Sequence, residues 1–308
     1  MLLLDYYYIH LFNIKYTNMN SSEDIVAANT RTIPVWARII LIFPVTMILG
    51  IPFFFFEFFF ESIKGALPNE LAVSLDLLLT SLFLTICVTI GVYIFRRNFD
   101  RESFFSLGFD VKHIWRHLLY ALITVLFIIG GGTFVLIYLD AVQISYAGMG
   151  AGIFFINVLT FALVAFNEEL LFRGYILSNL LRKMGRFWAL TLSSVLFGLM
   201  HLGNNQVDWL PIINLILAGY LLGVTYIYTR NLWYPIFLHF FWNFIQGPIL
   251  GYEVSGSQTI SIFRMEAGSN VYLSGGLFGF EGSAACSILT LLFIVLIAVC
   301  YKRAQVKG

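Results

Sequence analysis

Long apolar stretches dominate this chain of 308 residues and constrain its fold more than any other feature. A helix that crosses the hydrocarbon core of a bilayer needs about 20 mostly apolar residues. The stretches are apolar all round and show no alternating ten-residue pattern, so an outer-membrane barrel is not indicated. The sequence predicts an all-α polytopic membrane protein, a bundle of about eight transmembrane helices. The expected spans are residues 35–60, 71–95, 115–139, 152–177, 187–202, 210–229, 232–250 and 281–301.

The composition excludes most soluble classes of protein. Hydrophobic residues make up 59% of the chain and charged residues only 11%, against about 45–50% and about 25% in a typical soluble domain. Lys and Arg number 18 and nearly balance the 17 Asp and Glu. A nucleic-acid partner is therefore not expected, because it would require a basic face. The expected surroundings are the lipid bilayer.

Basic residues mark alternate loops. They precede the first span and follow the second, fourth, sixth and eighth, whereas the other loops contain only Lys64 and Arg264. Because Lys and Arg accumulate on the cytoplasmic side, this alternation predicts that both termini are cytoplasmic, in what we expect to be a bacterial plasma membrane. The longest outer loop, residues 251–282, is rich in Gly and Ser and is expected to be irregular.

A single membrane domain is expected over residues 35–301, between an N-terminal tail (1–34) and a cytoplasmic tail (302–308). The apolar start of the N-terminal tail is too short to span and lacks a preceding basic region, so it is a poor signal peptide. Polar residues begin beside Met19. Either translation starts at Met19, or residues 1–17 form an interfacial segment.

Charged residues inside the fourth span are the first candidates for a site, because a charge at the bilayer centre costs at least about 2.5–3.5 kcal/mol. Adjacent helical residues point about 100° apart, whereas residues four apart share a face. Glu169 and Arg173 can therefore pair, which leaves Glu168 free to face another element. The alternative is that all three form a structural ion cluster that locks two helices together.

Polar residues in two later spans are the second set of candidates. His201 ends the fifth span, and His239 and Asn243 lie four apart in the seventh, on one face. Taken singly, each is explained by packing or by an interhelical hydrogen bond. A helix rises about 1.5 Å per residue, so the depth of each residue can be counted from the cytoplasmic end of its span. The depths of the three residues overlap with that of Glu168 in the cytoplasmic half of the bundle. We expect the four side chains to converge there.

Such a group of side chains suits hydrolysis by an activated water. A Glu beside a His can hold and deprotonate a water, and a second His with an Asn can stabilise an oxyanion. Glu168, His201 and His239 also match a catalytic zinc ligand set that keeps an open position. Zinc-bound water and metal-free catalysis by Glu and His remain equal alternatives.

Three segments resemble the motifs of one family, the CPBP intramembrane proteases, which include the type II CAAX prenyl endopeptidases. The family motifs are Glu-Glu-x-x-x-Arg, Phe-x-x-x-His and His-x-x-x-Asn. Flanking segments are also similar, so that the resemblance covers about residues 100–283. The segments are NEELLFRGYIL at 167–177, FGLMHLGN at 197–204 and LAGYLLGVTYIYTRNLWYPIFLHFFWNF at 217–244, flanked by FFSLGF at 104–109 and GGLFGFEGS at 275–283.

This resemblance implies an endopeptidase of glutamate or metallo type that acts on a membrane-associated peptide or protein, CAAX-like or otherwise close to the lipid. It implies that Glu168 is the general base and that His201 helps to bind the water. It also implies that His239 and Asn243 stabilise the oxyanion, with the Glu–Arg pair of the fourth span in support.

Two other functions stay open on the sequence alone. The first is a non-catalytic scaffold of the same fold, for example the partner of a sensor kinase or an immunity protein. The second is a transporter with Glu168 as a proton relay, although no two-fold repeat of the kind found in transporters is evident. The oligomeric state is left open as well.

Overall fold

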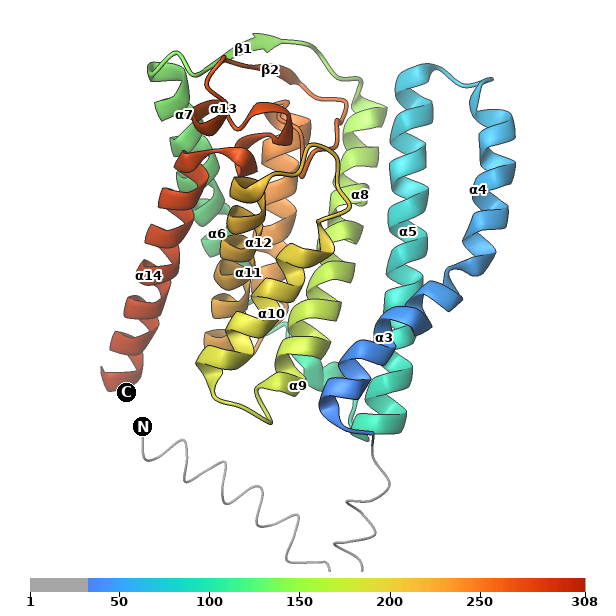
Figure 1. Ribbon diagram of the computed structural model, residues 1–308, viewed down its shortest axis with the longest axis vertical. Coiled ribbons are helices and arrows are strands. Elements are labelled where there is room, and N and C mark those ends of the chain that lie inside the picture. The colour runs from blue at the N-terminus through green and yellow to red at the C-terminus, as the bar shows by residue number, and fades with distance from the viewer. Residues whose placement is uncertain (1–32, 308) are drawn as a thin grey trace, which may run out of the picture.

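A computed structural model describes residues 33–307, with side chains from residue 33 to 301. The alternatives for Met19 and residues 1–17 lie outside this range. The described chain is a bundle of helices with one short sheet (Figure 1). The α-helices are α3 (Val35–Leu49), α4 (Ile51–Lys64), α5 (Asn69–Phe95), α6 (Ile114–Val125), α7 (Gly131–Tyr138), α8 (Ala151–Glu169), α9 (Ser178–Leu180), α10 (Arg186–Met200), α11 (Trp209–Thr229), α12 (Trp233–Phe244), α13 (Val271–Ser274) and α14 (Ala284–Lys307).

Shorter elements extend or join these helices. Four of them are π-helical, a form that is rare and frequently found at functional sites. The π-helical segments are η1 (Arg96–Asp100), η3 (Leu126–Gly130), η4 (Leu170–Leu177) and η5 (Ile245–Ile249), the 3₁₀ segments are η2 (Phe104–Leu107), η6 (Gly276–Phe278) and η7 (Phe280–Gly282), and the strands are β1 (Val142–Tyr146) and β2 (Phe263–Ala267).

Six helical stretches are long and apolar enough to cross a membrane, and the all-α membrane fold is thus confirmed. Two of the eight expected spans, 187–202 and 232–250, correspond to shorter helices: α10 has 15 residues, and α12 has 12 and continues into η5. The chain is an integral membrane protein. The six long stretches are Val35–Lys64, Asn69–Asp100, Ile114–Tyr138, Ala151–Leu180, Trp209–Thr229 and Ala284–Tyr301.

The first span is broken into two helices, which form an arm at the side of the bundle (Figure 1). Pro44 lies within α3, whereas the break comes at Gly50, two residues before Pro52. Proline lacks an N–H donor and fits the first turn of a helix, so Pro52 starts a new helix instead of continuing the old one. The ring of Phe53 lies 4.6 Å from that of Phe83 in α5, which ties this arm to the bundle.

Helix α11 lies at the centre of the bundle, and more than half of its residues are buried. Gly219 allows it to approach its neighbours closely: a Cβ at this position would lie 2.9 Å from Cα of Ser194 in α10. Small residues let membrane helices pack at short distance. The carbonyl of Gly219 accepts a 3.2 Å hydrogen bond from Nη2 of Arg173. Helices α10 and α11 and segment η4 thus meet at one glycine.

The FFSLGF segment fixes the turn between α11 and α12. Tyr226 Oη donates to the carbonyl of Leu107 at 2.9 Å, and the Leu232 amide donates to the carbonyl of Gly108 at 2.7 Å. Gly108 has φ +114°, and a Cβ there would lie 2.7 Å from the Arg230 carbonyl, so this position requires glycine. These contacts set where α12 begins and therefore how its polar residues are placed.

The loop of residues 251–282 was expected to be irregular. This expectation was wrong in part, because residues 263–267 form a strand. This strand pairs antiparallel with β1, which comes before α8, with Val142 opposite Ala267 and Tyr146 opposite Phe263. The sheet lies at the end of the bundle away from the carboxyl end of α14 (Figure 1). No local pattern in the loop predicts a partner so distant in the sequence.

Candidate active site

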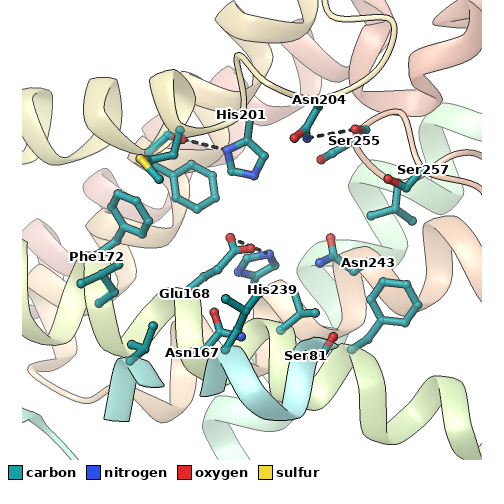
Figure 2. A pocket seen from close by; sticks show the side chains of 18 of the residues that line it. Ser81, Asn167, Glu168, Phe172, His201, Asn204, His239, Asn243, Ser255 and Ser257 are labelled. Carbon is teal, nitrogen blue, oxygen red and sulfur yellow. Dashed lines mark hydrogen bonds and ion pairs between the residues drawn. The ribbon is translucent and has the colours of Figure 1, made fainter. Parts of the chain in front are cut away.

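One cavity of about 810 Å³ is lined by all four residues that we singled out as a catalytic set. Glu168 comes from the end of α8, His201 from the residue that caps α10, and His239 and Asn243 from α12. Figure 2 shows their side chains turned toward the same space. Segments that are far apart in the sequence thus contribute to a single site.

The four side chains occupy two sides of this cavity. Glu168 and His239 lie together on one side, and His201 faces them from the other (Figure 2). Among residues 33–301, no group of three His, Cys, Asp or Glu side chains is arranged to hold a metal ion. The expected zinc ligands, Glu168, His201 and His239, therefore do not fit a metal ion in this arrangement.

Glu169 and Arg173 form a buried ion pair where α8 passes into the π-helical segment η4. Nη1 of Arg173 donates to Oε1 of Glu169 at 2.6 Å, and the side chains are 1% and 0% exposed. The guanidinium also lies 4.4 Å from the ring centroid of Phe197, a cation–π contact. A buried charge requires such compensation. The pair expected from the four-residue spacing is present, and Arg173 has further partners on α10 and α11.

His239 is held by the same carboxylate. Its Nδ1 atom donates to Oε1 of Glu169 at 2.9 Å, so one oxygen serves both His239 and Arg173. The other ring nitrogen, Nε2, lies 3.9 Å from Oε2 of Glu168. Because Nδ1 carries a proton, Nε2 is an acceptor in the neutral ring and a second donor in the protonated ring.

The two adjacent glutamates have different surroundings. Glu169 is fully buried and engaged by Arg173, whereas the side chain of Glu168 is 27% exposed and lines the cavity. Oε2 of each glutamate has no hydrogen-bond partner among the described residues, but only Glu168 reaches the cavity. A carboxylate oxygen with unused acceptor capacity can bind a water or a substrate group. Of the two, Glu168 is therefore the one available for chemistry.

The Phe-x-x-x-His motif orients His201. Nδ1 of His201 lies 2.8 Å from the carbonyl oxygen of Phe197, which can only accept, so Nδ1 carries the proton. In the neutral ring, Nε2 is then an acceptor. The ring of Phe197 packs 4.9 Å from that of His201 and 6.1 Å from that of His239, measured between centroids. Phe197 thus contacts both histidines.

Asn243 completes the group one turn beyond His239. It is 5% exposed, lines the cavity, and turns its amide toward the open space (Figure 2). Helix α12 ends one residue later, at Phe244, and continues as the wider η5, which contains Pro248. Proline removes a backbone donor from the helix. The regular α-helix therefore ends soon after Asn243.

Several residues of the cavity were not predicted. Trp242 lies within the HFFWN segment and Glu281 within GGLFGFEGS, so both are in segments that carry the resemblance. A mainly apolar wall comes from α3, α4 and α5, which lie outside the range 100–283 and contain no residue that we predicted to belong to the site. Its members include Phe43, Met47, Phe53, Leu77, Leu84 and Cys87.

Comparison with known proteins supports the resemblance. Residues 150–245 match the model of the family described as type II CAAX prenyl endopeptidase Rce1-like. The matched stretch includes α8, α10, α11 and α12 with all three motifs. No curated protein and no solved structure matches the chain. The part of the chain that carries the three motifs is therefore similar to the Rce1-like family of type II CAAX prenyl endopeptidases.

Proposed function

We propose that the chain is an intramembrane endopeptidase that hydrolyses a peptide bond in a membrane-associated peptide or protein. The family match supports proteolysis in general terms. One observation carries the proposal to the site: the partly exposed side chain of Glu168 lines a cavity also lined by His201, His239 and Asn243. The adjacent Glu169, by contrast, is fully buried and forms an ion pair with Arg173.

In this proposal Glu168 acts as the general base. Its carboxylate takes a proton from a water, and the water oxygen attacks the carbonyl carbon of the substrate. Nε2 of His201, an acceptor in the neutral ring, orients the same water from the opposite side of the cavity. The proton held by Glu168 then passes to the leaving amine nitrogen as the C–N bond breaks, which restores the carboxylate.

His239 and Asn243 stabilise the negative charge that develops on the carbonyl oxygen. The amide of Asn243 donates in any protonation state of the site. Nε2 of His239 donates only when the ring carries both protons, because Nδ1 is already bound to Glu169. The Glu169–Arg173 pair supports this arrangement by holding the imidazole in one orientation.

The cavity supports a substrate that is partly apolar. The proposed catalytic groups lie on α8 and α12 and at the end of α10, whereas α3, α4 and α5 supply mainly Phe, Leu and Met side chains. A CAAX-like or other lipid-proximal peptide would place its polar backbone between Glu168 and His201 and its apolar part against this wall. The alternation of basic loops supports cytoplasmic termini, in what we propose to be a bacterial plasma membrane.

The test is cleavage of a membrane-anchored reporter peptide by the purified chain in liposomes. The Glu168→Gln variant should lose activity by about 10²–10⁴-fold, as expected when a general base is removed. Glu266→Gln, which changes an exposed carboxylate on β2, should cleave like the wild type. Full cleavage by Glu168→Gln would overturn the proposal. A cellular phenotype that survives substitution of all four site residues would favour the scaffold instead.

A further inference from the structure

Glu281 is a second buried carboxylate at the cavity, and the proposed chemistry does not use it. It lies in η7, before the last helix, and is 4% exposed. Nε1 of Trp242 donates to its Oε1 at 2.9 Å. The backbone amide and the hydroxyl of Ser255 donate to its Oε2 at 3.0 Å and 2.8 Å. Both oxygens are therefore occupied by donors of the protein itself.

The backbone that carries this carboxylate is also fixed. Nδ2 of Asn214, a residue of α11 that is 1% exposed, donates to the carbonyls of Glu281 at 2.7 Å and Ser283 at 2.9 Å. The Ser287 hydroxyl donates to Oδ1 of the same asparagine at 2.6 Å. Glu281 is thus anchored to the central helix and presents its carboxylate from a rigid base.

The bonds to Glu281 reach the proposed catalytic groups from two directions. Trp242 lies directly before Asn243 in α12, so the Glu281 bond holds the turn that carries the oxyanion donors. Ser255 in turn accepts, through its carbonyl, a 3.0 Å bond from Nδ2 of Asn204, three residues beyond His201 (Figure 2). One carboxylate therefore connects α12 with the segment that follows α10.

We propose that Glu281 is a positioning residue for peptide hydrolysis: it fixes Trp242 and Ser255, and thereby the separation between Asn243 and His201 across the cavity. This inference rests on the proposed function. Burying a charged carboxylate costs free energy unless hydrogen bonds compensate for it. A neutral side chain would be enough if only one hydrogen bond between two loops were needed. A carboxylate has two acceptor oxygens, one for Trp242 and one for Ser255, whereas an amide has only one acceptor oxygen.

Such a role differs from acid–base catalysis in what it changes. A misplacement of about 1 Å can reduce a rate about 100-fold without altering which groups titrate. Glu281→Gln replaces one acceptor oxygen by an NH₂ donor, so it cannot accept from both Trp242 and Ser255. We expect kcat to fall about 10- to 100-fold, KM to change less than about threefold, and the pH profile to keep its shape.

The experiment measures cleavage of the liposome reporter by Glu281→Gln, Trp242→Phe and the double variant. If Glu281 acts partly through Trp242, the double variant should lose less than the product of the two single losses. Ser255→Ala removes only the hydroxyl donor and serves as the milder variant if Glu281→Gln folds poorly. The control is Glu253→Gln: the carboxylate of Glu253 bonds only the exposed Gln258 side chain, at 3.3 Å, and the variant should match the wild type.

A second readout does not depend on activity. The chain has six tryptophans, and the indole N–H signal of Trp242 is identified in ¹⁵N spectra by its loss in Trp242→Phe. Glu281→Gln should shift this signal and speed its hydrogen exchange. Wild-type kcat in Glu281→Gln, multiplicative losses in the double variant, or an altered pH profile would each overturn the inference. A wild-type chain without cleavage contradicts the proposed function, whereas the indole signal still decides whether Glu281 holds Trp242.

Discussion

His239 donates from Nδ1 to Oε1 of Glu169 at 2.9 Å, and this bond directs the opposite ring nitrogen toward the cavity. The same oxygen of Glu169 accepts from Arg173 at 2.6 Å. Glu169 therefore joins the fourth span to α12, whereas Glu168, its neighbour in sequence, stays free of such a bond at Oε2. Glu169 thus orients His239, whereas Glu168 is the proposed general base.

The buried ion pair gives the first prediction. Removing one partner of a buried pair leaves the other charge uncompensated, which costs about 3–5 kcal/mol. Arg173→Met should therefore lower the free energy of unfolding in detergent by about this amount. The control is Lys64→Met, which removes the more exposed pairs of Lys64 with Glu61 and Asp76 and should change stability by no more than about 1 kcal/mol. Equal stability of Arg173→Met and the wild type would contradict this reading of the pair.

Asn243 gives a prediction about rate. Loss of one oxyanion donor typically lowers kcat about 10²–10³-fold. Asn243→Ala should show a loss of this size with KM nearly unchanged, because the bond forms mainly in the transition state. Gln143→Ala removes an exposed amide on β1 and should leave both constants as they are. If Asn243→Ala raised KM and left kcat intact, the residue would bind substrate and not the oxyanion.

Gly219 gives a prediction about packing. A methyl group here would lie 2.9 Å from Cα of Ser194, so Gly219→Ala must push α11 away from α10 and from Arg173. Overpacking of this kind costs about 1–3 kcal/mol, and thermal unfolding should show the loss together with reduced cleavage. Gly152→Ala is the matched control, because its methyl would meet no atom within 4 Å. Wild-type stability of Gly219→Ala would refute the close approach.

Metal dependence gives a further prediction. Glu168, His201 and His239 do not form a group that could hold a metal within residues 33–301. We therefore expect the purified chain to cleave its reporter at an unchanged rate after treatment with a zinc chelator. Metal analysis of the active preparation should show far less than one zinc per chain. Stoichiometric zinc, with activity lost on chelation and restored by zinc alone, would instead support the metallo alternative.

The sequence predicted those features that follow from local helix geometry. The four-residue spacing of Glu169 and Arg173 places both on one face, and their ion pair at 2.6 Å follows from that spacing. His239 and Asn243 line the cavity from one helix for the same reason. Scarcity of charge in the apolar spans made these residues stand out. Their proposed roles remain predictions.

Features that depend on distant contacts could not be predicted. The pairing of Val142 with Ala267 joins two loops whose sequences give no register. The bond from Trp242 to Glu281 joins a helix to a Gly-rich segment that follows it at a distance, and neither residue signals the other. Met47 lines the apolar wall only because α3 packs beside the cavity, and nothing in its sequence surroundings distinguishes it from other apolar residues of a membrane helix. Tertiary packing, not local pattern, decides these contacts.

The most direct test of the central claim is to map new C-termini by mass spectrometry in membranes from cells that express the wild-type chain or Glu168→Gln at equal levels. We predict that at least one membrane-associated peptide or protein is cut at a defined bond in wild-type cells. The same bond should stay intact with Glu168→Gln and be cut with the Glu266→Gln control. Identical cleavage patterns in wild-type and Glu168→Gln cells would contradict the account.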